Sequence, residues 1–411
     1  MAIVKPFKAI RATRDKVALV SSRPYDDYTP AELGAQLDFN PFSFLHIINP
    51  SHLNREEVSA DERFAEIKSK YNEFKKKHTY IKEKKPVYYI YQKITPFNNF
   101  IGIIAATSTE DYNNGIIKKH EKTLKKREIL FKNYLKATGF NAEPVLLTYP
   151  DNDNINTIIK KYKTQRAEYE FTTHNHKTHL LWIVENEKDI ETISNEFKKT
   201  KALYIADGHH RSASSNLLAK HLAKNNPNHT GNEAYNYCLS FLISESNLVI
   251  KEFNRLVKHL NGLTNEAFLN KLNKHFKLTK LSKNIYKPTK THNFSIYLGN
   301  EVYLAEFKIK NKGFKSALHQ LDTHILYKYI LKKILGIDNL RTDKNIAYAN
   351  NVKGQAYLKE QVQNGNFKVA FGLYPISVEQ MKNVANQGLK MPPKSTYVLP
   401  KLRSGFTIYE F

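Results

Sequence analysis

The stretch that decides the fold reads Lys201-Ala202-Leu203-Tyr204-Ile205-Ala206-Asp207-Gly208-His209-His210-Arg211-Ser212-Ala213-Ser214-Ser215-Asn216-Leu217-Leu218. Its first part, Ala202 to Ala206, is a short apolar run that predicts a buried strand. Its last part carries small and apolar residues at helical spacing, which predicts a helix. Gly208 stands between the two parts and permits a sharp turn and a close approach of the backbone. We therefore expect a corner at which a strand turns into a helix.

The turn of this corner concentrates groups that attract anions. The first amides of the following helix are unpaired and carry partial positive charge. His209, His210 and Arg211 stand at that helix start and add to an anion site best suited to phosphate. Asp207 precedes the glycine and could hold a metal or position a nucleophile. A structural turn does not need four ionisable side chains in five positions, so we favour a functional site over a plain corner.

The motif Ala206-Asp207-Gly208-His209-His210-Arg211 resembles the signature of the family called domain of unknown function 1015. Its Gly-x-x-Arg core is similar to the nucleotide-phosphate motif of the ParB-like and sulfiredoxin-like superfamily, which includes free L-serine kinases. The resemblance implies ATP or ADP as phosphoryl donor, Mg²⁺ as metal, and a small molecule with a hydroxyl group as substrate. Free L-serine is the first candidate for that substrate. It also implies a nucleotide-phosphate site made of Gly208, His209, His210, Arg211 and Ser212.

Five other stretches are similar to landmarks of the same family and together span nearly the whole chain. They are Pro24-Tyr25-Asp26, Asn40 to His46, His120 to Thr123, Phe253 to Val257 and Met391 to Lys401. The chain departs from the family pattern at Arg23, Asp27 and Asn254. By resemblance, the landmarks supply carboxylates (Asp26, Glu121), nucleotide contacts (His120, Thr123, Arg255) and substrate contacts (Ser43, His46, Lys394, Ser395, Thr396). The sequence does not rank Asp207, Glu121 and Asp26 as catalytic base or as metal ligand.

Ordinary structural explanations compete with these roles. A predicted helix that includes His120 to Thr123, continues through Lys125 to Thr138 and is closed by Gly139 would place His120 and Thr123 on one solvated face. A histidine in the strand expected within Asn40 to Ile48 is more often structural, and an arginine at a strand end, such as Arg255, more often pairs at the surface. The tail could be a terminal strand that docks on the core.

Three histidines, His174, His176 and His179, suggest a metal site at first sight. They belong to a predicted hairpin between Glu168 and Val184, and His174 and His176 would share one strand face. Because the hairpin tip is polar, we expect solvent-exposed histidines and no zinc site.

The chain of 411 residues is longer than one core usually holds, so several parts are expected. We predict an α+β fold of mixed sheets with flanking helices, in which a ParB/sulfiredoxin-like core is followed by an elaborated C-terminal half. The expected parts are an N-terminal α/β part (1–150), the motif region (151–235) and a C-terminal α+β part (236–411). Local patterns further predict a strand at Lys16 to Val20 and helices that begin near Pro30 and Asp61.

Bulk composition limits the class of protein. The single cysteine, Cys238, excludes an intramolecular disulfide and lies in a run that predicts a buried strand. The beginning of the chain lacks the apolar stretch of a signal peptide, and no run approaches membrane-spanning length, so we expect a cytoplasmic protein without a membrane partner. The net charge of +25 makes a nucleic-acid partner possible. Lysines interleaved with acids favour a solvated basic surface instead.

These features together predict a nucleotide-dependent kinase that phosphorylates a hydroxyl group of a small molecule. Phosphoryl transfer needs charge neutralisation, alignment and a group that orients or deprotonates the acceptor. The alternative is a ParB-like regulatory protein that binds nucleotide or nucleic acid without small-molecule turnover, although no convincing helix-turn-helix pattern is present. A homodimer remains open.

Overall fold

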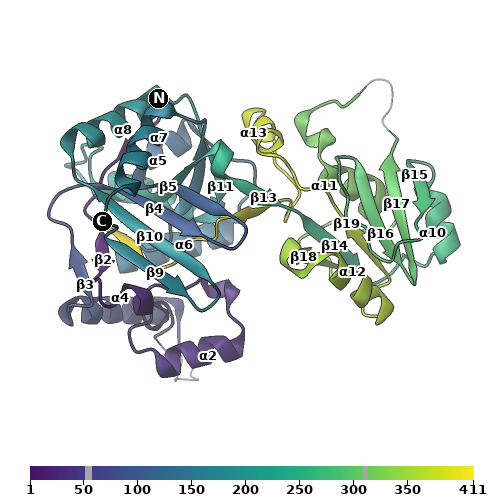
Figure 1. Ribbon diagram of the computed structural model, residues 1–411, viewed down its shortest axis with the longest axis horizontal. Coiled ribbons are helices and arrows are strands. Elements are labelled where there is room, and N and C mark those ends of the chain that lie inside the picture. Colours follow the sequence, from purple (N-terminus) through teal and green to yellow (C-terminus); the bar gives the residue numbers. More distant parts are fainter. Residues whose placement is uncertain (51–57, 309–312) are drawn as a thin grey trace. The chain divides into compact units, whose positions relative to one another are not determined.

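The computed structural model describes residues 1–50, 58–308 and 313–411. The fold is α+β with several mixed sheets, as predicted. The chain forms two compact units (Figure 1). The first unit contains Met1–Lys118, Thr123–Leu248 and Pro400–Phe411, and the second contains Lys119–Lys122 and Val249–Leu399.

The first unit is built on a nine-stranded sheet. Its strands run in the order β6 (Ile117–Lys118), β11 (Leu203–Asp207), β8 (Val145–Tyr149), β12 (Tyr237–Ser244), β5 (Asn99–Ser108), β4 (Tyr88–Ile94), β10 (Lys177–Val184) and β9 (Tyr169–Thr173), while β1 (Val4–Lys5) pairs with β5. Two pairs are parallel, β11 with β6 and β12 with β8, and the others are antiparallel. The predicted strand Ala202 to Ala206 is thus confirmed as part of β11, inside this sheet.

One face of the sheet is covered by α7 (Asp153–Lys163) and α8 (Glu187–Lys199), which lie beside it in Figure 1. Ile155, Ile193 and Phe197 of these helices join a core with strand residues such as Ile90 and Trp182. Side chains alternate along a strand, so the residues between them on β4, including Tyr91 and Lys93, face the opposite side. That opposite side holds the basic cluster described below.

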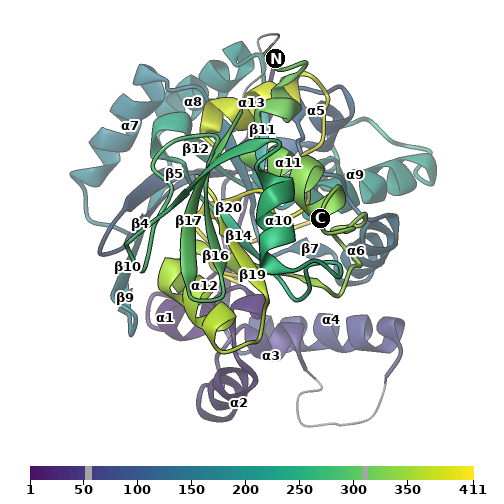
Figure 2. The ribbon, with the colours of Figure 1, turned by 90° about the vertical axis from the view of Figure 1, so that its right-hand side faces the viewer.

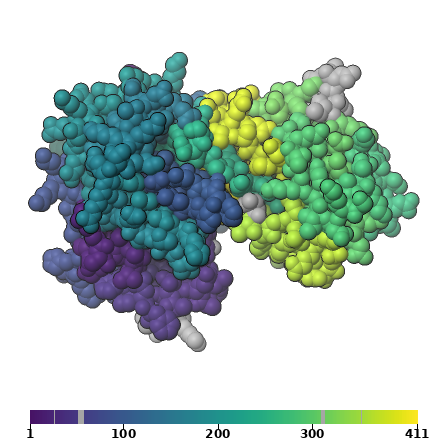
Figure 3. Space-filling view, viewed as in Figure 1, coloured from purple at the N-terminus to yellow at the C-terminus, as the bar shows by residue number. Residues whose placement is uncertain are grey.

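A smaller sheet ties the two ends of the chain together in the first unit. Its strand order is β3 (Tyr80–Lys82), β2 (Ile10–Ala12), β21 (Thr407–Glu410) and β7 (Phe140–Asn141). Besides α7 and α8, the first unit contains the helices α1 (Val17–Val20), α2 (Pro30–Phe39), α3 (Leu45–Ile48), α4 (Ala60–Lys76), α5 (Thr109–Asn113), α6 (Lys125–Thr138) and α9 (His209–Lys224). Phe64, Ile67, Tyr71 and Phe74 of α4 are buried, as their spacing predicts. By contrast, α2 lies at the surface (Figure 3).

The second unit has a six-stranded antiparallel sheet (Figure 2). The order is β15 (Phe276–Lys280), β17 (Glu301–Phe307), β16 (Asn293–Leu298), β19 (Val369–Gly372), β14 (Phe253–Val257) and β18 (Ile346–Asn350). Its helices are α10 (Asn265–Leu272), α11 (Asp322–Ile325), α12 (Gly354–Gln363) and α13 (Val378–Asn386). A separate two-stranded ribbon joins β13 (Val249–Lys251) to β20 (Tyr397–Leu399). The family landmark Met391 to Lys401 thus docks through a strand.

Three local predictions are wrong. Val17–Val20 forms α1 instead of a strand, and the second half of Asn40 to Ile48 forms α3. Short apolar runs fit a strand and a buried helical turn equally well, so periodicity cannot separate the two. The helix predicted to include His120 to Thr123 begins only at Lys125, because Ile117–Lys118 pairs with β11 and residues 119–122 leave the first unit. Consequently His120 and Thr123 do not share a helix face.

In the part of the chain that the structure describes, no helix combines the length and the apolar character needed to cross a lipid bilayer.

Candidate functional site

The candidate site begins at the corner between β11 and α9, which the sequence predicts. Asp207 is the last residue of β11, and Gly208 adopts the left-handed conformation with φ of 96° just before the helix. A Cβ atom on Gly208 would lie 3.2 Å from the guanidinium of Arg211. Glycine is therefore required at this position for two reasons. It permits the positive φ, and it leaves room for the Arg211 side chain to fold back over the turn.

Asp207 and Arg211 are joined at the corner by a third charged residue, Lys401. The Lys401 Nζ donates to Asp207 Oδ2 at 3.1 Å, and Arg211 Nη2 lies 3.9 Å from the same oxygen. Arg211 Nη1 donates to the carbonyl of Pro144 at 2.7 Å and lies 3.7 Å from Glu143 Oε2. The side chains of Asp207 and Arg211 are 40% and 31% exposed, so a ligand in solution can reach them.

The charge state of Asp207 follows from these neighbours. Burial by itself would raise the pKa of Asp207, but the positive charges of Lys401 and Arg211 outweigh it. Hydrogen bonds from Lys401 and from the Gly208 amide act in the same direction, so the pKa lies below its usual value. Asp207 is therefore an ionised carboxylate at neutral pH, available as a hydrogen-bond acceptor or metal ligand.

The two histidines of the motif lie differently from Arg211. His209 and Ser212 are buried in the first turn of α9. The backbone amide of Leu124, the N-cap residue of α6, donates to His210 Nε2 at 3.1 Å. Thr123 Oγ1 donates to Glu128, also at the start of α6. Because His210 Nε2 accepts this hydrogen bond, the neutral ring carries its proton on Nδ1, and Nδ1 is the His210 atom that can donate to an anion. Arg211 and Lys401 supply the positive charge beside Asp207.

A second group of charges lies on the sheet face opposite α7 and α8. Lys93 on β4 stands directly across from His179 on β10, which in turn faces Phe171 on β9. Directly opposite residues of an antiparallel pair project to the same side of the sheet. The segment after β20 passes over these residues, since Lys93 Nζ donates to the Lys401 carbonyl at 2.5 Å and the Arg403 guanidinium lies 5.7 Å from the Phe171 ring centre.

These groups form a cluster with excess positive charge. Lys93 is 7% exposed, and burial lowers its pKa to about 7, with further lowering by the charges of Lys177 and Arg403. Burial likewise lowers the pKa of His179 to about 2, again reinforced by Arg403 and Lys93. The negative charge of Asp27 acts in the opposite direction and raises the pKa of Lys93.

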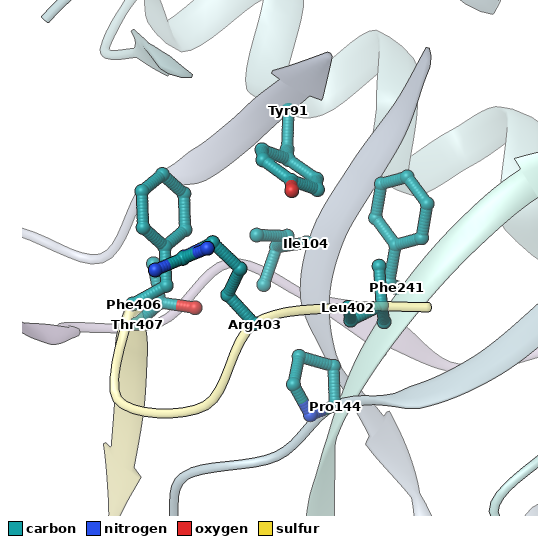
Figure 4. A pocket seen from close by; sticks show the side chains of 8 residues that line it. All are labelled: Tyr91, Ile104, Pro144, Phe241, Leu402, Arg403, Phe406 and Thr407. Atoms are coloured by element: carbon teal, nitrogen blue, oxygen red, sulfur yellow. The ribbon is translucent and has the colours of Figure 1, made fainter. Parts of the chain in front are cut away.

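Figure 4 shows the small cavity beneath this segment, with Arg403 extending toward Tyr91 and Phe406. Its volume is about 10 Å³, enough for one water molecule. The lining residues are Tyr91, Ile104, Pro144, Phe241, Leu402, Arg403, Phe406 and Thr407. Pro144 links this cavity to the corner, because its carbonyl is the acceptor of Arg211.

Sequence reasoning missed Lys93, Glu143 and Arg403 and stopped short of a role for Lys401. A signal existed for Lys93, because it follows Gln92 in a strand whose other residues are tyrosines and isoleucines. The sequence pattern also predicted His179 at an exposed hairpin tip. His174 and His176 are exposed, but His179 is 1% exposed and its Nδ1 bonds the Tyr91 hydroxyl at 2.7 Å, so that expectation is wrong for His179. The hairpin is longer than its polar tip, and His179 belongs to the paired strand.

Two predicted substrate contacts, Ser43 and His46, serve local structure. Ser43 Oγ accepts from the Leu45 amide at 3.3 Å, and His46 Nε2 lies 3.0 Å from the Asn40 carbonyl, so both stabilise the turn into α3. Asp26 lies in the turn Tyr25–Asp27, but its side chain is outside what the structure describes.

The remaining predicted residues belong to the second unit. Arg255 is 1% exposed and donates to the carbonyls of Phe253 and Lys394, the latter at 2.9 Å; burial lowers its pKa to about 10. Ser395 Oγ donates to the Pro392 carbonyl at 2.6 Å, whereas Lys394 is exposed with Nζ 5.5 Å from the Phe253 ring centre, and Thr396 is half-buried. Arg255 therefore anchors the tail through its backbone.

His120 and Glu121 lie in the short segment Lys119–Lys122 of the second unit. The Met391 amide donates to the His120 carbonyl at 2.8 Å, and the Lys390 Nζ donates to the Lys119 carbonyl at 2.7 Å. His120 is buried and Glu121 is half-buried. The segment is thus held by the same tail that Arg255 anchors.

A family model described as protein of unknown function (DUF1015) matches residues 4–324. The chain belongs to this family. The match includes the corner at Asp207 to Arg211, whereas the tail landmark lies beyond the matched residues. No curated protein matches the sequence.

Several solved structures share weak similarity with this family member. A mutant of free serine kinase in complex with AMP is 14% identical, with a TM-score of 0.37 over 73% of this chain and 88% of that chain. SbnI with a C-terminal truncation, from Staphylococcus aureus, is 13% identical, with a TM-score of 0.38 over 73% and 84%. A conserved hypothetical protein from Pyrococcus furiosus is 13% identical, with a TM-score of 0.35 over 72% and 90%.

The donor set at the corner bears on the predicted Mg²⁺. Among the described residues, no three histidine, cysteine or carboxylate side chains come together as a metal cage. Mg²⁺ is usually bound by one or two carboxylates together with substrate phosphates and water, so a cage is not required. Asp207 is an ionised carboxylate beside cations that suit phosphates, and it fits the role of single protein ligand.

Proposed function

We propose that the chain is a nucleotide-dependent phosphotransferase that moves a phosphoryl group from ATP or ADP to a hydroxyl group of a small molecule. The observation that carries the proposal is the grouping of Asp207, Arg211 and Lys401 at the start of the 16-residue helix α9. Helix amides and flexible cations attract phosphates, and the carboxylate among them can act on a metal or on the acceptor.

The roles follow from the geometry of the corner. Arg211, Lys401 and the first amides of α9 would hold the phosphates of the donor, with Gly208 to Ser212 as the turn that presents them. The acceptor oxygen would form a bond to the terminal phosphorus as the bond from that phosphorus to the bridging oxygen breaks. The nucleotide leaves with that oxygen, and the hydroxyl proton goes to a base. Asp207 is our first choice for the base or for the Mg²⁺ ligand.

Other residues keep their predicted roles as part of the proposal. Glu121 and Asp26 stay as further candidate carboxylates, with His120, Thr123 and Arg255 as nucleotide contacts. Ser43, His46, Lys394, Ser395 and Thr396 stay as substrate contacts. Free L-serine as acceptor, and the ParB/sulfiredoxin relationship, rest on the resemblance of Gly208 to Arg211 alone. The predicted domain boundaries and the cytoplasmic location likewise remain proposals.

The direct test is nucleotide consumption by the full chain, screened with ATP and ADP over hydroxyl amino acids, inositols and sugars. A phosphorylated acceptor formed in step with nucleotide loss supports the proposal. The Asp207→Asn variant serves as the control, because it keeps the shape of the side chain and removes its charge. Turnover that is equal in this variant and in the parent would place the chemistry elsewhere.

The net charge of +25 favours a second candidate function, a nucleotide- or nucleic-acid-binding regulator without turnover. Affinity for DNA measured across a salt series distinguishes it from the kinase. Binding through lysines releases counter-ions and falls steeply with salt. A kinase with a solvated basic surface should still bind ADP at about 0.2 M salt, slightly above physiological ionic strength, and should lose most of its DNA binding there.

A further inference from the structure

We propose that Lys93, His179 and Arg403 form a second anion subsite, which holds a carboxylate or phosphate group of the second substrate. The proposal rests on the proposed function in one respect, that the corner at Asp207 takes the nucleotide. Lys401 connects the two places, since its Nζ bonds Asp207 and its carbonyl bonds Lys93.

The first argument is charge. In the described part of the chain, neither Lys93 nor Arg403 forms an ion pair with a carboxylate. Lys93 Nζ bonds the Lys401 carbonyl, and Arg403 bonds the carbonyl and the Oγ of Ser21, with Nε to Oγ at 2.9 Å. Burying an ammonium without a counter-charge is costly. Such a cost is repaid when an anion binds beside it.

The second argument is an unused donor. His179 is 1% exposed, and within the described residues its Nε2 is buried with no hydrogen-bond partner. Its other ring nitrogen bonds the Tyr91 hydroxyl at 2.7 Å. Burial keeps the ring neutral, so one ring nitrogen carries the proton. We assign that proton to Nε2, with the Tyr91 hydroxyl donating to Nδ1. Orphaned buried polar atoms are uncommon in folded proteins, and this one stands on the sheet face next to Lys93.

The subsite couples anion binding to proton uptake. The charged groups that act on Lys93 are Lys177 on β10, Lys401 and Arg403 on the C-terminal segment, and Asp27, while His179 stands directly across from it on β10. The pKa of Lys93 is about 7 without ligand, so much of the side chain is neutral above that pH. An anion nearby raises this pKa, and the amine then takes up a proton. Affinity should therefore decline as the pH rises above 7.

The test is calorimetric titration of the full chain, saturated with ADP, with sodium sulfate, which does not itself titrate near neutral pH. Titrations in two buffers of different ionisation enthalpy give the number of protons bound. We expect an uptake approaching one proton per sulfate near about pH 8 and close to none near about pH 6. Sodium acetate as a second probe shows whether the group held is a carboxylate or a phosphate-like dianion, and binding of either probe supports the proposal.

Two matched variants decide the location. Lys93→Met should weaken sulfate binding roughly 10- to 100-fold, the range for a lost hydrogen bond to a charged group, and should abolish the proton uptake. Its melting temperature should equal or exceed that of the parent, because it removes a buried charge. A purely structural lysine would instead lower it. Lys277→Met, an exposed lysine of β15, is the control and should change neither property.

Lys177→Met, at a half-buried position, keeps the test valid should Lys93→Met fail to fold, and it should weaken sulfate binding severalfold. Sulfate binding unchanged in these variants overturns the subsite. Loss of all sulfate binding on saturation with ADP also overturns it, since one shared site would then suffice. A parent chain that binds sulfate through Lys93 but does not bind ADP would refute the proposed function and leave the subsite standing.

Discussion

Replacing Arg211 by alanine is the sharpest perturbation of the corner. The guanidinium lies over Gly208, donates to the Pro144 carbonyl at 2.7 Å, and has charged neighbours in Glu143 and Asp207. Alanine removes these contacts but leaves Asp207 paired with Lys401. The fold should therefore tolerate the change, with a loss of about 1 kcal/mol for one part-exposed hydrogen bond.

The effect on nucleotide binding should be larger. Two unit charges about 4 Å apart interact by about 4 kcal/mol at an effective dielectric constant of about 20. The 31% exposure of the Arg211 side chain reduces that figure through screening by water. The range of about 1.5–3 kcal/mol for hydrogen bonds to charged groups is then appropriate. It corresponds to a dissociation constant for ADP that is roughly 10- to 100-fold higher.

The assay is calorimetric titration of ADP into the parent, into Arg211→Ala and into Arg14→Ala. The Arg14 side chain is 68% exposed and pairs with Glu168 in the same unit, which makes it a matched control with no expected effect. The salt dependence of ADP affinity should also be shallower in Arg211→Ala, because one cation is gone. Equal ADP affinity in Arg211→Ala and the parent, at equal melting temperature, would refute the anion-site reasoning.

Three further predictions concern other parts of the chain. Asp207→Asn should lower turnover by roughly 10²–10⁴, while ADP affinity, measured by calorimetry, changes much less. Partial rescue of turnover by added Mg²⁺ would identify Asp207 as a metal ligand. Turnover equal to that of the parent would exclude Asp207 both as catalytic base and as metal ligand. A chain cut after Gly388 loses β20 and β21, which pair with β13, β2 and β7, so its thermal transition should lose cooperativity, and a parent-like melt would contradict this. Burial raises the pKa of Asp322 to about 7, so the folded state retains a proton that the unfolded state releases above about pH 4; stability should fall as the pH rises from there to about 7. Asp322→Asn, which keeps an acceptor for the His292 amide, should flatten this dependence in melting curves recorded across that range, and an unchanged slope would count against it.

Local sequence signals were sufficient wherever the stabilising groups are neighbours in the chain. Thr29 and Ser59 each form a capping box with a glutamate three residues later, and α2 and α4 begin there. Gly139 ends α6 in the left-handed conformation, as predicted. Cys238 is a buried strand residue, also as predicted. These features depend on contacts within about one helical turn or one strand, so sequence reasoning reaches them.

The corner at Asp207 to Arg211 could likewise be predicted from local sequence, because its apolar run, its glycine and its polar helix start are consecutive in the chain. By contrast, Val17–Val20 and Leu45–Ile48 are too short for periodicity to separate a helix from a strand. The helix predicted to include His120 to Thr123 does not form there, because the preceding residues Ile117–Lys118 pair with β11, a contact between residues far apart in the chain.

The amino-acid sequence by itself therefore determined the strand–glycine–helix corner with its Asp207 and Arg211, since each of its signals is local. Only the tertiary structure decided what surrounds Asp207. Lys401 meets it across 194 residues, and the carbonyl of Lys401 meets Lys93 across 308. Those contacts depend on the order of the strands and on the return of the C-terminal segment across the sheet face. No local spacing encodes that path, because it is set by which hydrophobic faces pack together over the whole first unit.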